Sequence, residues 1–212
     1  MTDAHCHVGA GGGVRELLSG VDFIGHHPWE AASLPEGWFE RLAAELDARA
    51  GVGVGEIGLD RLRSKTIAPE MRDVFLRQLS LAAEKSRRVV LHGAKCWGEV
   101  VKACKPYSGA VPAFLFHGFS RSGGLIPEIV ELGGYISVGP AVLNDHALNY
   151  RELVRRIPRE RLLVETDRTE ERAAGTPPVA EVAAKVAELL GMDAGELEKL
   201  TDENARRFLG EA

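Results

Sequence analysis

The stretch PEMRDVFLRQLSLAAEKSRRVVLHG, residues 69–93, contains the repeating unit of this chain. Its first part, residues 69–86, is a strongly amphipathic segment, which predicts a helix. The apolar run RVVLHG at 88–93 predicts a buried strand, and this strand ends at a histidine, His92. The same alternation of strand and helix continues in both directions along the chain. Such a pattern predicts parallel strands joined by right-handed crossovers.

Seven apolar runs are expected to form strands, and two further helices are expected to close the chain, at 177–191 and 193–210. The predicted fold class is α/β, a TIM-type (β/α) barrel in shortened or distorted form, with residues 1–212 as a single domain. The runs are MTDAHCH (1–7), VDFIGHHP (21–28), VGVGEIGL (52–59), RVVLHG (88–93), AFLFHGF (113–119), GYISVG (134–139) and RLLVETD (161–167).

The chain is short for an eight-stranded barrel, because it has 212 residues where such barrels typically have about 250. The shortage falls between His7 and Val21. Glycines and the segment VRELLSG (14–20), expected to be a short helix, replace a full crossover there. The barrel is therefore expected to close with seven strands or to stay partly open. An open gap would be covered by a helix or by a second subunit, giving a homo-oligomer.

Composition narrows the class of protein. The hydrophobic share of 45% and the charged share of 27% are ordinary for a soluble globular protein. The net charge of −5 argues against a broad basic surface for nucleic acid, although a metal-loaded site could still accept a nucleic-acid substrate. The three cysteines form no CxxC pair, and neither a signal peptide nor a long apolar stretch is evident. The expected location is the cytoplasm, with no membrane contact.

Six side chains of metal-ligand type stand at or just after the ends of predicted strands. In a (β/α) barrel these ends form one rim, which is where the active site is built. Taken singly, each side chain has an ordinary explanation, as a hydrogen-bonded core histidine or as half of a salt bridge. Taken together, they predict the metal centre of a hydrolase. The six are His5, His7, Glu56, His92, His117 and Asp167.

Spacing and setting add detail to this prediction. Residues two apart on a strand face the same way, so His5 and His7 can chelate one divalent ion while Asp3 orients a ring. Glu56 lies among Gly, Val, Ile and Leu, where an unpaired carboxylate would be costly to bury. Its functional interpretation is a bridge between two cations. Imidazole and carboxylate ligands suit Zn, Mn, Ni or Fe.

In this order, the motifs resemble those of the TatD-type metal-dependent hydrolases (the TatD DNase family), a branch of the amidohydrolase-like barrels. The resemblance covers nearly the whole chain. It implies metal-dependent hydrolysis of DNA, with Mg added to the candidate metals. The motifs are DAHCH (3–7), GHHP (25–28), GEIGLD (55–60), LHG (91–93), FHGFS (116–120), ETD (165–167) and TDENARRFLG (201–210).

The resemblance distributes the ligands between two divalent ions, the first held by His5, His7 and Asp167, the second by His92 and His117, with Glu56 bridging them. Two such ions activate a water molecule and stabilise the leaving group. Asp167 is the candidate to take the proton of that water, so Asp167 and Glu56 are the predicted catalytic residues. The candidate substrate contacts are His27, Lys95, Ser120, Arg121 and Arg168. For Ser120 and Arg121, a solvated loop is an equally open interpretation.

The sequence departs from the family pattern in three places. Ala94, followed by Lys95, stands where the family usually has an arginine; Arg168 and Thr169 replace the usual Ala-Pro after ETD; and a unit is missing near residues 8–20. The first expectation is therefore a phosphodiesterase that acts on DNA or another phosphate ester, and the second alternative is an amide or ester hydrolase. A non-catalytic metal-binding scaffold is the third alternative. Cationic side chains gathered beside the metals, from among Lys95, Arg121, Arg168 and Arg172, would favour a phosphate ester.

Overall fold

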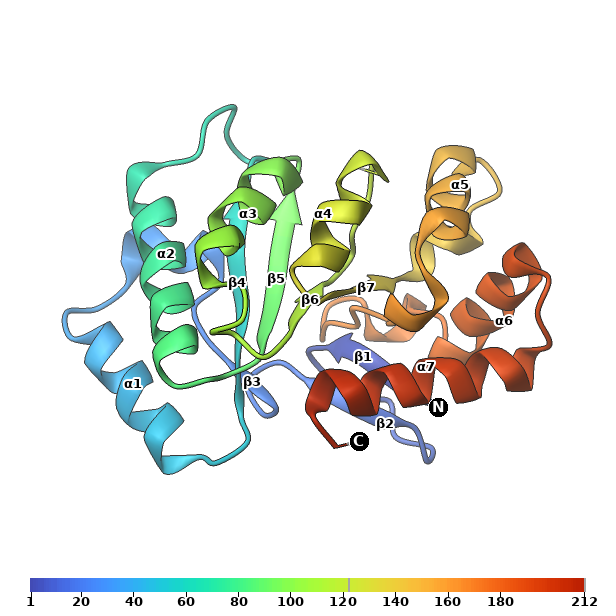
Figure 1. The fold of residues 1–212 in the computed structure, drawn as a ribbon, viewed down its shortest axis with the longest axis horizontal. Coiled ribbons are helices and arrows are strands. Elements are labelled where there is room, and N and C mark those ends of the chain that lie inside the picture. Colours follow the sequence, from blue (N-terminus) through green and yellow to red (C-terminus); the bar gives the residue numbers. More distant parts are fainter. Residues whose placement is uncertain (122, 212) are drawn as a thin grey trace.

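The computed structural model describes residues 1–121 and 123–211, which form an α/β barrel with its helices on the outside of the strands (Figure 1). Within these residues there are eight strands, and every strand pair is parallel. The strands are β1 (Thr2–Cys6), β2 (Arg15–Leu18), β3 (Phe23–Ile24), β4 (Gly53–Asp60), β5 (Val89–Ala94), β6 (Phe114–Phe116), β7 (Gly134–Val138) and β8 (Leu162–Val164).

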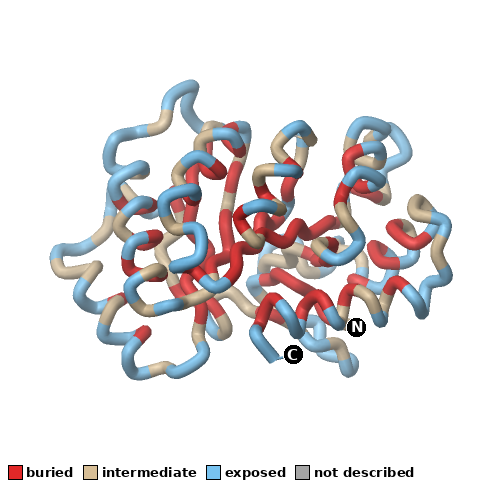
Figure 2. Tube along the Cα trace, in the orientation of Figure 1, coloured by how far each residue is buried: buried red, intermediate tan, exposed pale blue. Residues whose placement is uncertain are grey.

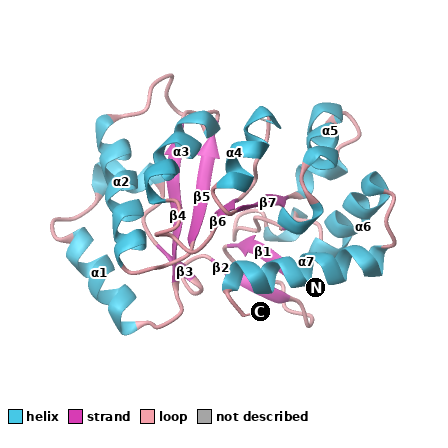
Figure 3. Cartoon of the chain, in the orientation of Figure 1, coloured by secondary structure: helices cyan, strands magenta, loops and turns pink. Residues whose placement is uncertain are grey.

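Seven α-helices of the described chain follow the predicted amphipathic segments (Figure 3). They are α1 (Trp38–Ala48), α2 (Pro69–Glu84), α3 (Trp97–Cys104), α4 (Ile126–Glu131), α5 (Leu148–Arg156), α6 (Val179–Leu190) and α7 (Ala194–Leu209). Local signals set their ends. For example, the Asp193 side chain caps α7 by accepting hydrogen bonds from two backbone N–H groups, and Gly210 ends α7 in a left-handed conformation. Among the described residues, none of these helices is long and apolar enough to span a membrane.

Two weak seams close the barrel. Strands β3 to β8 form one sheet in sequence order, and β1 and β2 form a second. On one side, the N–H of Asp167 after β8 donates to the carbonyl of His5 in β1, at 3.0 Å. On the other side, a parallel bridge joins Ser19 to Phe23, next to β2 and β3. The two-stranded sheet of β1 and β2 is therefore attached to both edges of the larger sheet, although by few contacts.

The segment at 14–20 corrects one prediction. It was expected to be a short helix, but it contains β2, so the barrel has eight strands rather than seven. Arg15 pairs with Thr2 of β1, and Leu17 is buried while Arg15 is exposed. Pairing with β1 outweighs the helical preference of a four-residue segment, since isolated short helices are marginal. The shortage is therefore one of crossover helices, which are absent from the described chain both between β1 and β2 and between β2 and β3, and not of a strand.

Buried residues follow the strands through the middle of the molecule (Figure 2). The larger apolar cluster fills the space between the strands and the outer helices. A smaller cluster brings Val90, Leu115 and Leu163 together with Ala205 and Phe208 of α7. These three strand positions lie two residues before polar residues, which therefore share their face of the sheet. The polar residues above this apolar base are His92, His117 and Glu165.

Candidate metal centre

Glu56 of β4 lies at the middle of the polar cluster, with only 5% of its surface exposed. Its two carboxylate oxygens face different pairs of histidines. Oε2 lies 3.3 Å from Nε2 of His5 and 3.5 Å from Nε2 of His7. Oε1 lies 2.6 Å from Nδ1 of His92 and 2.6 Å from Nε2 of His117. Each oxygen of the Glu56 carboxylate therefore faces its own pair of imidazole nitrogens.

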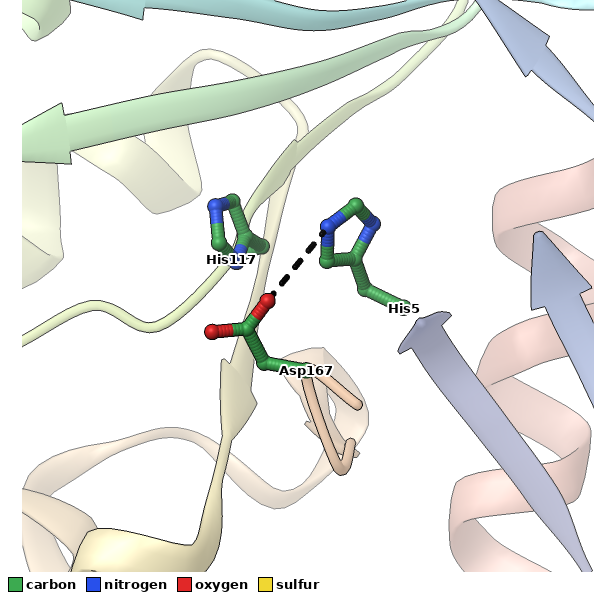
Figure 4. Close-up of side chains that lie close together, drawn as sticks. All are labelled: His5, His117 and Asp167. Atoms are coloured by element: carbon green, nitrogen blue, oxygen red, sulfur yellow. Dashed lines mark ion pairs between the residues drawn. The ribbon is translucent and has the colours of Figure 1, made fainter. Parts of the chain in front are cut away.

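Asp167 completes the first side of the centre. Its Oδ1 lies 3.6 Å from Nε2 of His7 and 4.0 Å from Nε2 of His5. Figure 4 shows the side chains of Asp167 and His5 pointing toward each other beside His117. Asp167 has a φ of 47°, in the left-handed region that non-glycine residues rarely adopt. Such strained residues cluster at functional sites, and here the conformation accompanies a carboxylate turned toward the histidines.

The two histidines on the second side are each backed by a second carboxylate. Nε2 of His92 lies 2.9 Å from Oδ2 of Asp60, and Nδ1 of His117 lies 3.6 Å from Oε1 of Glu165. Glu165 is itself held by the N–H of Gly118, at 2.7 Å. Carboxylates behind metal-binding histidines fix the ring orientation and raise ligand basicity. Asp60 is therefore placed to orient the His92 ring from behind.

Asp3 has a different role from the one expected. Instead of orienting an imidazole ring, its carboxylate accepts hydrogen bonds from the backbone N–H of Thr166 at 2.9 Å and from the Thr166 hydroxyl at 2.6 Å. Thr166 immediately precedes Asp167. Asp3 thus fixes the segment that carries Asp167 and strengthens the seam between β1 and β8.

The charges of the centre compensate one another. Hydrogen bonds to Asp167 and Glu56 raise the pKa of His7 to about 9. Burial opposes ionisation of Asp167, but the hydrogen bond from His7 and the nearby histidines lower its pKa to about 2. Burial likewise opposes ionisation of Glu56, yet His117 and the other histidines hold its pKa well below the usual value. The two carboxylates are therefore ionised at neutral pH and need positive charge beside them.

The residues of the centre fit divalent cations. Both ring nitrogens of His5 are buried and have no hydrogen-bond partner in the described part of the chain. Leaving such groups unsatisfied costs about 1–3 kcal/mol each, and a bound cation would satisfy the nitrogen that faces Glu56. The nitrogen and oxygen donors match what Zn and similar ions bind. Three groups of ligand atoms each lie within 4.8 Å of one another: His5, His117 and Asp167; His5, His7 and Glu56; and His27, Glu56 and His92.

His27 reaches the centre from the GHHP turn. Its Nδ1 accepts a hydrogen bond from the N–H of Trp29 at 3.2 Å, and its Nε2 lies 3.8 Å from Oε1 of Glu56. Burial lowers its pKa to about 4, so the ring is neutral at pH 7. Gln78 of α2, fully buried, fixes this turn by accepting from the His26 N–H at 2.7 Å and donating to the His26 carbonyl at 3.0 Å.

Sequence reasoning missed Gln78. Its only signal is a polar residue on the apolar stripe of a predicted helix, beside Val74, Phe75 and Leu79, which are also buried. Such a residue can be satisfied in several ways, and its partner here is 52 positions away in the sequence.

A cleft of about 750 Å³ opens from the centre on the side of β4 to β6. Lys95, Ser120 and Arg121, which were predicted substrate contacts, line it together with His92 and Asp167. A second cleft of about 550 Å³ lies toward β7 and β8, lined by Tyr150, Glu165 and Arg172 among others.

Two arginines after β8 lie in different places. Arg172 donates to Oδ2 of Asp167 at 3.2 Å, so it lies at the centre. The Arg168 guanidinium instead donates to the Thr176 carbonyl at 3.3 Å, and Arg168 is not among the described residues that line either cleft. The reason lies in its backbone, because the Arg168 carbonyl accepts from the N–H groups of His7 and Val8. The structure therefore does not bring Arg168 to the substrate side.

The fold and the centre together define a metal-dependent hydrolase built on an α/β barrel. Comparison with known proteins agrees, because the family model described as TatD related DNase matches residues 15–210. The chain belongs to this family. The sequence-based prediction of a TatD-type hydrolase on a TIM-type barrel is thereby confirmed, and divalent metal use follows from the class.

Individual relatives support the same assignment. The uncharacterized metal-dependent hydrolase YabD of Bacillus subtilis is 31% identical over 207 residues, covering 91% of this chain and 80% of the relative. The 3′-5′ ssDNA/RNA exonuclease TatD of Pectobacterium atrosepticum is 31% identical over 195 residues, covering 86% and 75%. Among solved structures, the TatD homologue YJJV from Escherichia coli k12 has a TM-score of 0.75 at 27% identity, covering 88% and 75%. A TatD family hydrolase from Entamoeba histolytica, with a TM-score of 0.74 at 17% identity and coverage of 92% and 75%, supports the fold alone.

Proposed function

We propose that this chain is a phosphodiesterase that hydrolyses nucleic acid with the help of two divalent ions. The observation that carries the proposal is the position of Glu56, whose two oxygens each face a separate pair of histidines. His5, His7 and Asp167 would hold one ion, and His92 and His117 the other, with Glu56 between them. The histidine-rich donor set favours Zn, Mn, Ni or Fe over Mg.

Two bound ions in such a site would activate a water molecule and stabilise the charge that develops on the phosphoryl oxygens. The protein's own side chains would accept the proton of that water and bind the phosphate. Asp167 is ionised at neutral pH, and 33% of its side chain is exposed, so it can reach a solvent water and accept its proton. Glu56 is too deeply buried for that role. His27, which is neutral at pH 7, would donate a hydrogen bond to a phosphate oxygen rather than a charge.

The cations around the centre favour a phosphate ester over an amide or a carboxylic ester. Lys95 and Arg121 line the larger cleft, and Arg172 lies at Asp167. A phosphodiester carries a negative charge that these side chains complement, whereas a neutral carbonyl substrate gains little from them. The relatives named 3′-5′ ssDNA/RNA exonuclease support nucleic acid as the phosphate ester. Ser120 lines both clefts and would donate a hydrogen bond to the same group.

Two earlier expectations stay predictions. A homo-oligomer was expected at the shortened side of the barrel, but β2 fills that side, so a second subunit is not needed to cover it. A cytoplasmic location is supported by three cysteines that are buried and form no disulfide: Cys6, Cys96 and Cys104.

The direct test is cleavage of a labelled single-stranded oligonucleotide by protein stripped with a chelator and reloaded with Mn, Zn or Mg. Glu56→Gln is the matched control, since it keeps the shape of the side chain but removes the charge. We expect metal-dependent cleavage by the wild type and at least a hundredfold loss in the variant. An aryl ester and an amide run in parallel. Hydrolysis of either of these with intact DNA would overturn the nucleic-acid substrate and keep the metal centre.

A further inference from the structure

A basic hollow lies beside the centre, and it is lined by residues 61–65 and by Lys95, which directly follows β5. Residues 61–65 belong to the loop that joins β4 to α2, at the top of Figure 1. It measures about 430 Å³, and four of the six described residues that line it are cationic while none of the six is acidic. The whole chain carries a net charge of −5, so this concentration of positive charge is a local reversal. We call it the basic shelf; its residues are Arg61, Leu62, Arg63, Ser64, Lys65 and Lys95.

The basic shelf is continuous with the cleft that opens from the metal centre. Arg61, Leu62 and Lys95 line both hollows. The larger cleft in turn reaches His92 and Asp167. An extended ligand that reacts at the centre can therefore continue along the cleft onto the shelf without leaving the protein surface.

The shelf is an organised site. The Arg61 guanidinium donates to the Lys95 carbonyl, through Nε at 3.0 Å, and so holds the turn in which Lys95 has a left-handed φ of 59°. The Arg63 guanidinium stacks 3.8 Å above the ring of Trp29. In the described part of the chain, Arg63, Lys65 and Lys95 form no ion pair with a carboxylate. Their charge is therefore available to an external anion.

Exposed apolar side chains accompany these cations. Trp29 is 47% exposed and Leu62 is 55% exposed, although both are large hydrophobic residues. The Trp29 ring also contacts the ring of His27, with centroids 4.8 Å apart, so it lies between the shelf and the centre. Cations that follow a phosphate backbone and flat apolar surfaces that contact unstacked bases are the two features of single-strand binding sites.

We propose that the basic shelf binds a single nucleic-acid strand through phosphates that lie beyond the scissile bond. This inference rests on the proposed function, and it adds a binding subsite that the hydrolytic reaction itself does not require. A substrate of several nucleotides then binds through both the centre and the shelf, whereas a small diester reaches the centre alone. Trp29 acts as a positioning residue by holding Arg63 over the shelf.

The test compares two double variants that each remove two cations. Arg63→Ala/Lys65→Ala changes the shelf, and Lys199→Ala/Arg206→Ala removes two exposed cations from α7, at the bottom of Figure 1. The substrates are bis(p-nitrophenyl) phosphate and a ten-nucleotide oligothymidylate. For the oligonucleotide, we expect KM to rise about tenfold in the shelf variant. The slope of log KM against the logarithm of the salt concentration should fall by about 1.4, because the variant loses two phosphate contacts and each contact to a single strand contributes about 0.7 to this slope. Hydrolysis of the small diester should be unchanged, and the α7 variant should match the wild type throughout.

The outcomes distinguish a failure of the shelf proposal from a failure of the proposed function. If both variants hydrolyse both substrates with the same KM, the proposal of a binding shelf is wrong and the proposed function still stands. If the wild type hydrolyses neither substrate, the proposed function fails, and fluorescence anisotropy with the labelled oligonucleotide then tests the shelf alone. Weaker binding by the shelf variant only would support the shelf, and equal binding would overturn it. An equal loss of affinity for a duplex of the same length would contradict its preference for single strands.

Discussion

Nε2 of His92 lies 2.9 Å from Oδ2 of Asp60, and this contact leaves Nδ1 of the same ring facing Glu56. Asp60 is thus placed to orient His92, which we propose as a metal ligand. We expect Asp60→Asn to weaken binding of one of two divalent ions by about 10- to 100-fold, the usual cost of losing such a partner. Competition with a chromophoric chelator measures this loss. Asp73→Asn, on the exposed side of α2, is the matched control; similar metal affinities for the two variants would contradict the role of Asp60.

Gln78 provides the second prediction, because it satisfies both backbone groups of His26 in a buried place. We expect Gln78→Leu to lower the free energy of unfolding by about 2 kcal/mol, since two buried polar groups lose their partners. The GHHP turn should also loosen, so kcat should fall through His27 while metal affinity holds. Urea unfolding and steady-state kinetics measure the two effects. His26→Ala keeps the backbone bonds and should be nearly neutral; a loss of stability as large as that of Gln78→Leu would count against this account.

Metal binding should release protons. Hydrogen bonds to Asp167 and Glu56 raise the pKa of His7 from 6.5 to about 9. Protonation of His7 therefore contributes to the stability of the folded, metal-free protein. This contribution is fully present below pH 6.5 and is lost as the pH rises through 9. A metal ion must displace that proton at neutral pH, so metal affinity should rise with pH up to about 9. Calorimetry in buffers of different ionisation enthalpy should show release at pH 7.5, reduced by about one proton in His7→Asn. Proton release that does not differ between this variant and the wild type would contradict the assignment.

The sequence predicted most of the fold because its signals are local. Apolar runs and amphipathic segments identified all the strands except β2, and also the helices, because each of these patterns lies within one element. Strand β2 escaped because four residues are too few to show a period, and its pairing with β1 is a tertiary contact. The path of the chain after β8 could not be predicted from local patterns either. The position of Arg168 depends on its carbonyl bonding to His7 and Val8, more than 150 residues earlier.

The sequence predicted which residues make up the candidate site, but not the contacts that support them. The barrel rule collects strand ends at one rim, and the structure does bring the other five side chains together with Glu56. Their role as ligands stays a prediction. The contacts of Asp3 with Thr166 and of Gln78 with His26 join distant segments, so spacing along the sequence carries no trace of them.

Asp3 gives a prediction about stability and pH. Burial raises its pKa to about 6, although two hydrogen bonds from Thr166 act in the opposite direction. A carboxyl with a raised pKa in the folded state contributes stability below pH 4, and this contribution is lost as pH rises through 6. Asn mimics the neutral form and does not titrate. The Asp3→Asn variant should therefore gain stability relative to the wild type between pH 4 and pH 7, by up to about 3 kcal/mol.

Urea unfolding of both proteins at pH 4.5 and pH 7.5, in the presence of a chelator, measures this relative gain. The difference in unfolding free energy between Asp3→Asn and wild type should be more favourable to the variant at the higher pH. Other titrating groups are common to both proteins, so their contributions cancel in the comparison. Thr166→Val removes the hydroxyl partner and keeps the Asp3 carboxyl, so the pH dependence should persist in that variant. A difference between Asp3→Asn and wild type that stays constant with pH would show that Asp3 is ionised across the whole range, and that the hydrogen bonds from Thr166 outweigh its burial.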